Sequence, residues 1–191
     1  MNMDQLRRDV LFTEFLRGTN LVFHATWGLF SPKAIDYGTR LLIDHMEINP
    51  SDTCLDLGCG YGAIGLAMAT LARDGTVYMV DKDFVAVDYA KENATRNRLT
   101  NCRIFLSNGF SHVPPIPFNV IASNPPAKSG NELFYFMFTD AKERLVKDGK
   151  FYVVTISGLK NFIKRIFTEV FGNYEKVAQS RTYTLALAVR K

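Results

Sequence analysis

Apolar and polar residues alternate with two different periods along most of the chain. Short apolar runs bounded by Gly, Pro, Asn or Asp predict strands at 53–57, 76–80, 102–106, 118–122 and 151–156. Between these runs, apolar residues recur at helical spacing over about 64–71, 83–97, 131–145 and 159–170. Strands that alternate with helices predict an α/β fold in which helices cover both faces of a mostly parallel sheet.

The two ends of the chain depart from this alternation. Two β-rich segments at 174–177 and 182–189 leave only 178–181 between them, too short for a crossover helix, so we expect antiparallel neighbours. Near the N-terminus, apolar residues recur at near-helical spacing at Leu6, Val10, Leu11, Phe12, Phe15 and Leu16. We therefore expect residues 1–30 to form a partly helical extension and residues 31–191 to form the main domain.

The overall composition is that of one domain without a membrane span. The chain has 191 residues, of which 47% are hydrophobic, enough for one buried core and too few for two domains of ordinary size. No apolar run reaches the roughly 20 residues that cross a bilayer, and charged residues interrupt the N-terminus where a secretory signal would be apolar. We expect a soluble, cytoplasmic protein, and the oligomeric state is left open.

The cysteines and histidines form no disulfide or metal pattern. Cys54, Cys59 and Cys102 are odd in number and include no CxxC pair. The three histidines lie far apart and lack the spacing of paired ligands. We therefore expect reduced thiols and no metal site.

Positive charge gathers in the last third of the chain. Up to residue 127 there are 11 Lys and Arg against 13 Asp and Glu, whereas from residue 128 onward there are 12 against 6. Ordinary solvated lysines on helix faces would produce this bias. A surface that attracts nucleic-acid phosphates would produce it as well.

The candidate chemistry begins at Asp56-Leu57-Gly58-Cys59-Gly60, where a strand runs into a glycine turn and a helix. Glycines let the backbone turn sharply and approach a ligand, and the following helix points free N–H groups at it. Dinucleotide enzymes use a similar turn, but a carboxylate at Asp56 would repel a pyrophosphate. S-adenosylmethionine carries an ammonium and a sulfonium group and no phosphate, so this acid favours S-adenosylmethionine.

Two further positions fit the same ligand. Asp81 ends the second strand, where a carboxylate accepts hydrogen bonds from both hydroxyls of a ribose. Asn108 follows the third strand, where its amide would meet an adenine edge, although a plain Asn-Gly turn explains it equally well. The candidate cofactor-binding residues are Asp56, Gly58, Cys59, Gly60, Asp81, Lys82, Asn108, Gly109 and Asn124.

Several motifs together resemble a known family. They are Phe30-Ser31-Pro32-Lys33, Ile35-Asp36, Gly38-Thr39, Asp56-Leu57-Gly58-Cys59-Gly60, Asp81 and Asn124-Pro125-Pro126. They resemble the class I S-adenosylmethionine-dependent methyltransferases of the small-domain family, which includes ribosomal RNA guanine-N2 methyltransferases, and especially its short, single-domain archaeal members. The resemblance covers residues 26–191. It implies a Rossmann-like, seven-stranded sheet of order 3-2-1-4-5-7-6 with strand 7 antiparallel.

Asn124-Pro125-Pro126 suggests which atom receives the methyl group. The lone pair of an exocyclic amine or an amide nitrogen is delocalised into the adjacent π-system, so the nitrogen is a poor nucleophile. The side-chain oxygen of Asn124 and the carbonyl of Pro125 would accept its two N–H bonds and aim the lone pair at the methyl group. A rigid turn at a strand end is the structural alternative for this motif.

One residue departs from the family pattern. Enzymes with this motif that act on a planar target commonly place Tyr or Phe after it, and this chain has Ala127. Stacking would then come from Trp27, Phe30 or Phe134, or the pocket accepts a less planar target. Core packing is the better explanation for any one of these rings taken singly. The candidate substrate-contacting residues are Phe30, Ser31, Pro126, Ala127 and Lys128.

Three functions follow as hypotheses. The leading one is an N-methyltransferase that acts on guanine N2 in ribosomal or other structured RNA. The second keeps the chemistry but takes a protein glutamine as the acceptor, as in the release-factor methyltransferases that share Asn-Pro-Pro. The third is a non-catalytic module that binds RNA on a methyltransferase fold, which the complete set of candidate site residues argues against.

Overall fold

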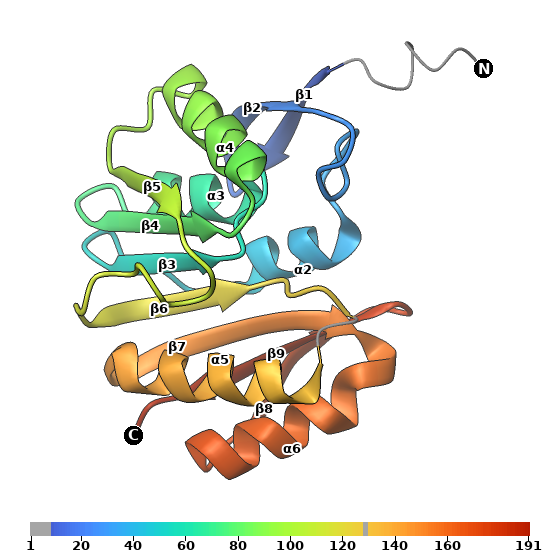
Figure 1. The fold of residues 1–191 in the computed structure, drawn as a ribbon, viewed down its shortest axis with the longest axis vertical. Helices are drawn as coiled ribbons and strands as arrows, with labels where there is room; N and C mark the ends of the chain where they lie inside the picture. Colours follow the sequence, from blue (N-terminus) through green and yellow to red (C-terminus); the bar gives the residue numbers. More distant parts are fainter. Residues whose placement is uncertain (1–8, 128–129) are drawn as a thin grey trace.

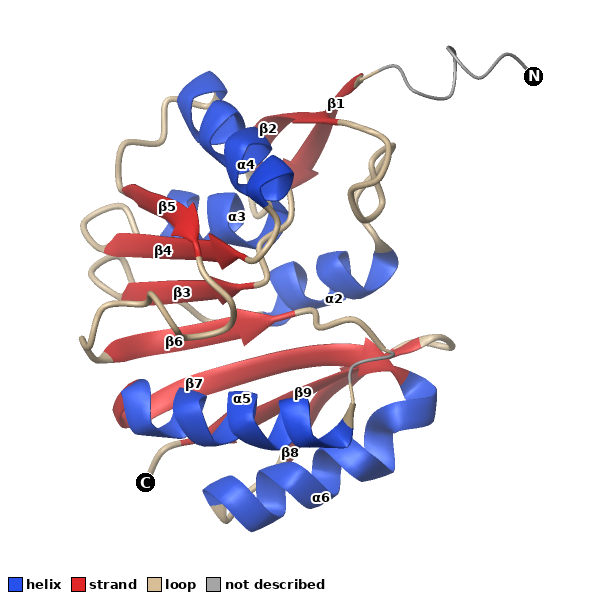
Figure 2. Cartoon of the chain, viewed as in Figure 1, coloured by secondary structure: helices blue, strands red, loops and turns tan. Residues whose placement is uncertain are grey.

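The computed structural model of the protein describes residues 9–127 and 130–191. Its centre is a seven-stranded sheet in which β9 alone runs against its neighbours (Figures 1 and 2). The order is β5-β4-β3-β6-β7-β9-β8, which is the order 3-2-1-4-5-7-6 of the resemblance, so this expectation is confirmed. The strands are β3 (Thr53–Leu57), β4 (Thr76–Asp81), β5 (Cys102–Leu106), β6 (Phe118–Ser123), β7 (Leu145–Ile156), β8 (Glu175–Gln179) and β9 (Tyr183–Val189).

Helices pack on both faces of this sheet, as expected. One hydrophobic cluster includes side chains of α2 (Tyr37–His45), α3 (Ala63–Leu71) and α4 (Phe84–Arg96), and a second includes side chains of α5 (Asn131–Arg144) and α6 (Lys160–Phe171). A short 3-10 turn, η1 (Ser157–Leu159), precedes α6. The amphipathic patterns predicted four of these helices and not α2, which has only nine residues.

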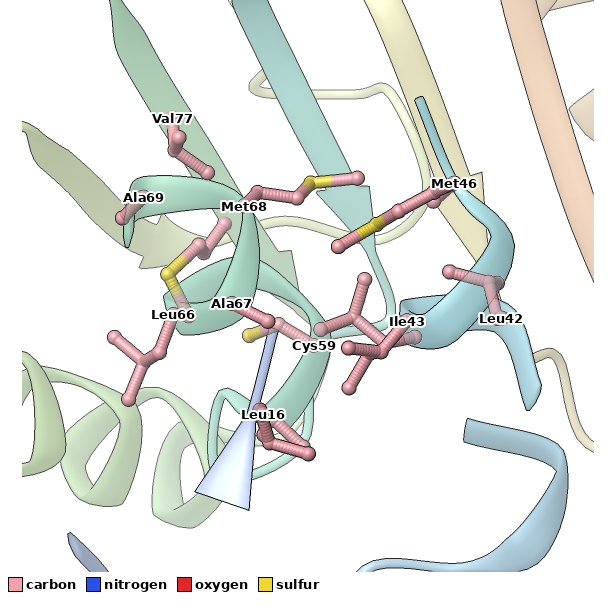
Figure 3. Close-up of a cluster of buried hydrophobic side chains, with 14 of the residues drawn as sticks. Leu16, Leu42, Ile43, Met46, Cys59, Leu66, Ala67, Met68, Ala69 and Val77 are labelled. Carbon is pink, nitrogen blue, oxygen red and sulfur yellow. The ribbon is translucent and has the colours of Figure 1, made fainter. Parts of the chain in front are cut away.

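The first cluster sets how closely α3 approaches the sheet. A Cβ atom on Gly65 would lie 2.5 Å from Cγ of Met79, so a glycine is needed for the helix to pack against β4 at this distance. Leu66, Met68 and Cys59 belong to the same hydrophobic cluster as Leu42 and Ile43 of α2 (Figure 3). The start of α3, and with it the turn that follows β3, is therefore held at a fixed height above the sheet.

The helical expectation for the N-terminal segment is wrong over residues 10–25. These residues form a hairpin of β1 (Val10–Leu16) and β2 (Thr19–Ala25), joined by a two-residue turn in which Arg17 and Gly18 have φ angles of 48° and 85°. Side chains along β2 alternate between buried and more exposed, so the period is two rather than 3.6. Residues 1–8, for which partly helical structure was also expected, lie outside the described part of the chain.

Two asparagines, Asn93 in α4 and Asn97 at its C-terminal cap, bind the backbone of β2. The Asn93 amide accepts from the backbone N–H of His24 at 2.7 Å and donates to its carbonyl at 2.9 Å. One helical turn later, Asn97 makes the same pair of bonds to Val22, at 2.8 and 2.7 Å. Asn93 is fully buried and donates a further bond, 2.9 Å long, to the carbonyl of Tyr61. One amide thus joins the hairpin to the segment that follows the glycine turn.

We predict that Asn93→Ala lowers the free energy of unfolding by about 3 kcal/mol, because it leaves the buried carbonyl of Tyr61 and the part-buried backbone groups of His24 without partners. Asn97→Ala removes a similar pair of bonds at a half-buried position and should cost about 1 kcal/mol. Urea unfolding of both variants measures the difference. Equal losses would contradict the importance assigned to Asn93.

Candidate functional site

The candidate site lies where the carboxyl ends of the parallel strands meet. β3 pairs in parallel with both β4 and β6, and Asp56 lies opposite Met79 on one side and Ala122 on the other. Residues that follow β3, β4 and β6 therefore emerge at the same sheet edge (Figure 1). A hydrogen bond joins two of these strand ends directly, because the Ser123 hydroxyl donates to the Leu57 carbonyl over 2.7 Å and across 66 residues of sequence.

The glycine turn after β3 leaves an open face. Gly58 and Gly60 have φ angles of 81° and 54°, in the left-handed region that favours glycine. A Cβ atom built on either residue would meet no atom within 4 Å. The turn itself is fixed, since the N–H groups of Gly58 and Cys59 both donate to the Val80 carbonyl at 2.9 Å. A ligand could therefore lie directly against this backbone, as the fit of a nucleoside cofactor requires.

Asp56 lies at the end of β3 beside the turn, and its carboxylate is not at the surface. The side chain is fully buried, and Oδ2 accepts from the backbone N–H of Gly65 at 2.7 Å, in the first turn of α3. Gly62, which caps α3, has no side chain to do this. Burial raises the pKa of the Asp56 carboxyl to about 7. Asp56, which the sequence predicts to contact a cofactor, thus also fixes the start of the helix that follows the turn.

The second oxygen of Asp56 has no partner. Oδ1 is the one buried side-chain oxygen or nitrogen without a hydrogen bond among the described residues. A buried, unpartnered carboxylate oxygen is costly unless a proton or a cation satisfies it. An ammonium group is such a cation. The unpartnered oxygen of Asp56 therefore fits a cofactor that carries the ammonium group of an amino acid.

Asp81 closes the opposite side of the turn. Its Oδ2 accepts from the N–H of Gly60 at 2.9 Å, and its Oδ1 accepts from the N–H of Asp83 at 3.0 Å. The side chain is half-buried. Each carboxylate oxygen keeps a lone pair after these bonds, so both oxygens could still accept from vicinal hydroxyls.

The remaining candidate cofactor residues differ in what they can offer. Cys59 is 7% exposed and packs in the core, and burial raises the pKa of its thiol well above the usual range, so only its backbone faces the turn. Lys82 is exposed directly after β4. Asn108 and Gly109 are exposed in a turn after β5, which the Ser107 hydroxyl ties together by donating to the Gly109 carbonyl at 2.8 Å.

Asn124 follows β6, and its amide is held from one side. Nδ2 donates to Asp36 Oδ2 at 3.2 Å and lies 2.9 Å from Thr39 Oγ1. An ionised carboxylate only accepts hydrogen bonds, so the nitrogen rather than the oxygen of Asn124 must face Asp36. The side-chain oxygen is left as the acceptor on the other side of the amide. Asn124 and Pro125 are half-buried, and Pro126 and Ala127 are exposed.

The segment before α2 carries exposed aromatic side chains and is bonded to the residue that follows the glycine turn. The Tyr61 hydroxyl, next to the glycine turn, donates to the Ser31 carbonyl at 3.2 Å and holds this segment in place. Phe30 is 63% exposed and Trp27 is 55% exposed, whereas Phe134 is 1% exposed and packs in the core between α5 and α6. Phe134 is thereby removed from the stacking candidates. Lys128 lies outside the described residues.

Sequence reasoning missed three residues around Asn124. Asp36 and Thr39 belong to the family motif, and Asp36 also carries a local signal, because Asp is a preferred residue at the N-terminal cap of a helix. Asp36 does cap α2, accepting from the Thr39 N–H at 3.0 Å. The third residue, Tyr183, donates to Asp36 Oδ1 at 2.7 Å across 147 residues, and no local pattern could have indicated it.

Two general features complete the description. Within residues 9–127 and 130–191, no group of three or more His, Cys, Asp or Glu could hold a metal ion. In the same residues, no helix is both long and apolar enough to span a bilayer.

Comparisons with known proteins agree with this arrangement. YbxB, an uncharacterized protein of Bacillus subtilis (strain 168), is 34% identical over 177 residues, which make up 91% of this chain and 88% of that protein. The T. thermophilus 16S rRNA N2 G1207 methyltransferase (RsmC), solved in complex with AdoMet and guanosine, superposes with a TM-score of 0.85 at 24% identity. That match covers 96% of this chain and spans only 51% of RsmC.

A methyltransferase from Pyrococcus furiosus is similar as well. It superposes with a TM-score of 0.68 at 24% identity and covers 86% of this chain and 90% of its own. At these identities the two structures show a common fold. The family is shown by a model of the methyltransferase small domain, which matches residues 20–186 and begins inside β2, ahead of the boundary expected at residue 30. The chain belongs to the methyltransferase small domain family of S-adenosylmethionine-dependent enzymes.

Proposed function

We propose that this S-adenosylmethionine-dependent methyltransferase acts on an exocyclic amino group of a base, guanine N2, in ribosomal or other structured RNA. The observation that carries the proposal is the orientation of Asn124, whose amide nitrogen is tied to Asp36 and whose oxygen is left to accept. The fold shared with RsmC, a protein named for N2 methylation of a guanine in 16S rRNA, supports the choice of base.

The residues that would hold the cofactor form four groups. Gly58 and Gly60 offer the open backbone face, Asp81 offers two carboxylate oxygens for ribose hydroxyls, and Asn108 offers an amide for the adenine edge. Asp56 Oδ1 offers a buried acceptor for the ammonium group. When bound, S-adenosylmethionine supplies an electrophilic methyl group and leaves as a thioether.

Asn124 and Pro125 would act on the acceptor nitrogen. Its two N–H groups donate to Asn124 Oδ1 and to the Pro125 carbonyl, which weakens the overlap of the lone pair with the ring. Proline has no backbone N–H, so nothing at these positions competes for the two acceptors. The nitrogen is positively charged once it carries the methyl group, and the same two oxygens stabilise this charge until a proton passes to water.

The surface for the rest of the substrate would come from the segment before α2. Phe30 and Trp27 are large, exposed rings on this segment, and Ala127 supplies none after the Asn-Pro-Pro motif. Ser31, whose backbone is tied to Tyr61, would set the position of Phe30. Base stacking on an aromatic ring is worth about 1–3 kcal/mol, so one of these rings would replace the missing aromatic residue.

The substrate is tested by incubating the protein with methyl-labelled S-adenosylmethionine and unmodified ribosomal or transfer RNA, followed by nucleoside analysis. We expect label in N2-methylguanosine. Label in protein instead, at a glutamine side chain, would replace the RNA proposal with the second enzyme hypothesis. No binding of S-adenosylmethionine at millimolar concentration in calorimetry would favour the non-catalytic module.

Asn124→Ala should separate turnover from cofactor binding. We expect kcat to fall by about 100-fold or more, because the main acceptor for the substrate N–H is lost, while the Kd for S-adenosylmethionine changes by less than about threefold. Asn119→Ala is the matched control: it lies at the opposite end of the same strand, where its side chain accepts from the Thr53 N–H. Parallel losses of turnover and cofactor affinity in Asn124→Ala would contradict the assigned role.

Asp56 makes cofactor affinity dependent on pH. Its pKa is raised to about 7 by burial, so the carboxyl is neutral below pH 7 and must lose its proton to attract an ammonium group. We expect the affinity of the wild-type protein for S-adenosylmethionine to fall by up to about tenfold per pH unit below 7 and to level off above it. Calorimetry between pH 5.5 and 8.5 measures this.

Asp56→Asn gives the comparison. The variant should bind more weakly at pH 8 and should lose the change in affinity near pH 7. Without cofactor, the same raised pKa means that the contribution of Asp56 to stability is largest below about pH 4 and is lost as pH rises through 7. An unchanged pH profile of cofactor affinity in Asp56→Asn would show that Asp56 serves only to hold the start of α3.

A further inference from the structure

The oxygen of Asn124 is prepared for its role by residues from two other parts of the chain. Asp36 Oδ2 accepts from two donors, the Asn124 Nδ2 at 3.2 Å and the backbone N–H of Thr39 at 3.0 Å. Thr39 Oγ1 lies 2.9 Å from the same Nδ2, and Thr39 is buried. The amide of Asn124 is therefore fixed at its nitrogen by two partners that both belong to the start of α2.

Tyr183, at the beginning of β9, holds Asp36 from the other side. Its hydroxyl donates to Asp36 Oδ1 at 2.7 Å. The two carboxylate oxygens therefore have different partners: Oδ1 accepts from Tyr183, and Oδ2 accepts from Asn124 and Thr39. This bond raises the pKa of Tyr183 to about 12, as expected for a hydroxyl that donates to a carboxylate. Hydrogen bonds on both oxygens thus fix the Asp36 carboxylate between Tyr183 of β9 and Asn124, and they oppose its rotation.

Gly38 leaves the space that the Tyr183 ring needs to reach Asp36. A Cβ atom at position 38 would lie 2.7 Å from Cδ1 and 2.9 Å from Cε1 of the Tyr183 ring, and 3.0 Å from Asp36 Oδ2. The φ angle of Gly38 is not in the left-handed region, so the backbone does not require glycine there. The space is required by the tyrosine ring, which passes over the helix start to reach Asp36.

The electrostatic consequence concerns the far end of the Asn124 amide. A carboxylate that accepts from the nitrogen of an amide polarises it and increases the negative charge on its oxygen. The substrate nitrogen gains positive charge as it takes the methyl group, so a more negative oxygen stabilises the transition state more than the ground state. The charge of Asp36 would reach the reacting atom through Asn124 without contact with the substrate.

We propose that Asp36 and Tyr183 are positioning residues for the methyl transfer: Asp36 orients and polarises the Asn124 amide, and Tyr183 fixes Asp36 for that task. The proposal deepens the proposed function and rests on the role assigned there to Asn124. Asp36 also caps α2, so its effect on catalysis has to be separated from an effect on folding.

Asp36→Asn removes the charge and keeps the shape. An asparagine oxygen can still accept from Thr39 and Asn124, and its amide group can donate to the Tyr183 hydroxyl, which turns to accept. We expect kcat to fall by about 10- to 100-fold, with the KM for RNA and the Kd for S-adenosylmethionine within about threefold of wild type. A purely structural role would change stability and both affinities and would leave kcat near its wild-type value.

Tyr183→Phe keeps the ring and removes the donor, and we expect kcat to fall by about three- to tenfold. Because Tyr183 acts through Asp36, the double variant Asp36→Asn/Tyr183→Phe should be no slower than Asp36→Asn alone. Tyr135→Phe is the matched control, since the Tyr135 hydroxyl also donates to a carboxylate, that of Glu169, between α5 and α6. It should leave kcat unchanged. Wild-type kcat in Asp36→Asn, or additive losses in the double variant, would overturn the proposal.

A second measurement does not depend on turnover. The side-chain NH₂ resonances of Asn124, identified in a ¹⁵N spectrum by their loss in Asn124→Ala, should move in Asp36→Asn and in Thr39→Val and stay in place in Tyr135→Phe. If label appears in protein rather than RNA, the guanine assignment fails and the kcat comparison is made with that acceptor. If the wild type methylates neither, the proposed function fails, and unmoved Asn124 resonances in both variants would overturn this proposal as well.

Discussion

The parallel pairing of β3 with β4 and β6 is the constraint on which the site depends. It places the residues after three strands at one sheet edge, although Leu57 and Ser123, which share a hydrogen bond there, lie 66 residues apart. A shift of one residue in the pairing of β6 would turn the side chains of its last residues to the opposite faces of the sheet. The Ser123–Leu57 bond resists such a shift.

Charged side chains in this site act on backbone and amide groups before they meet any ligand. Asp56 holds the start of α3, Asp81 holds the glycine turn, and Asp36 holds the start of α2 together with Asn124. Each carboxylate therefore fixes the geometry of a turn or helix start and also contributes negative charge next to it. Because the carboxylates are already hydrogen-bonded to the backbone, the polar groups of the candidate site are in place before a ligand binds. Less reorganisation is then needed during the reaction.

The sequence was sufficient for the sheet and for most of the helices because their periods are regular and their ends carry turn residues. The sequence is misleading at residues 10–25, where apolar residues on both faces of a short hairpin imitate helical spacing. The local sign of the hairpin is Gly18, which has a positive φ angle in the turn after Arg17. For the site, strand ends located Asp81 and Asn124 correctly at the sheet edge. The complete burial of Asp56 depends on how α3 packs, and the contact of Tyr183 with Asp36 arises only from the tertiary fold, so no local pattern predicts either one.

The Asn93 amide, which bonds to His24 in the hairpin and to Tyr61 beside the glycine turn, has a consequence for motion. Local opening of the hairpin must break the bonds between His24 and the amide that also holds Tyr61, so we expect the two segments to behave as one cooperative unit. A ligand that orders the turn would then slow hydrogen exchange in β2, far along the chain from any residue it touches. The first described strands are in this sense coupled to the glycine turn of the candidate site.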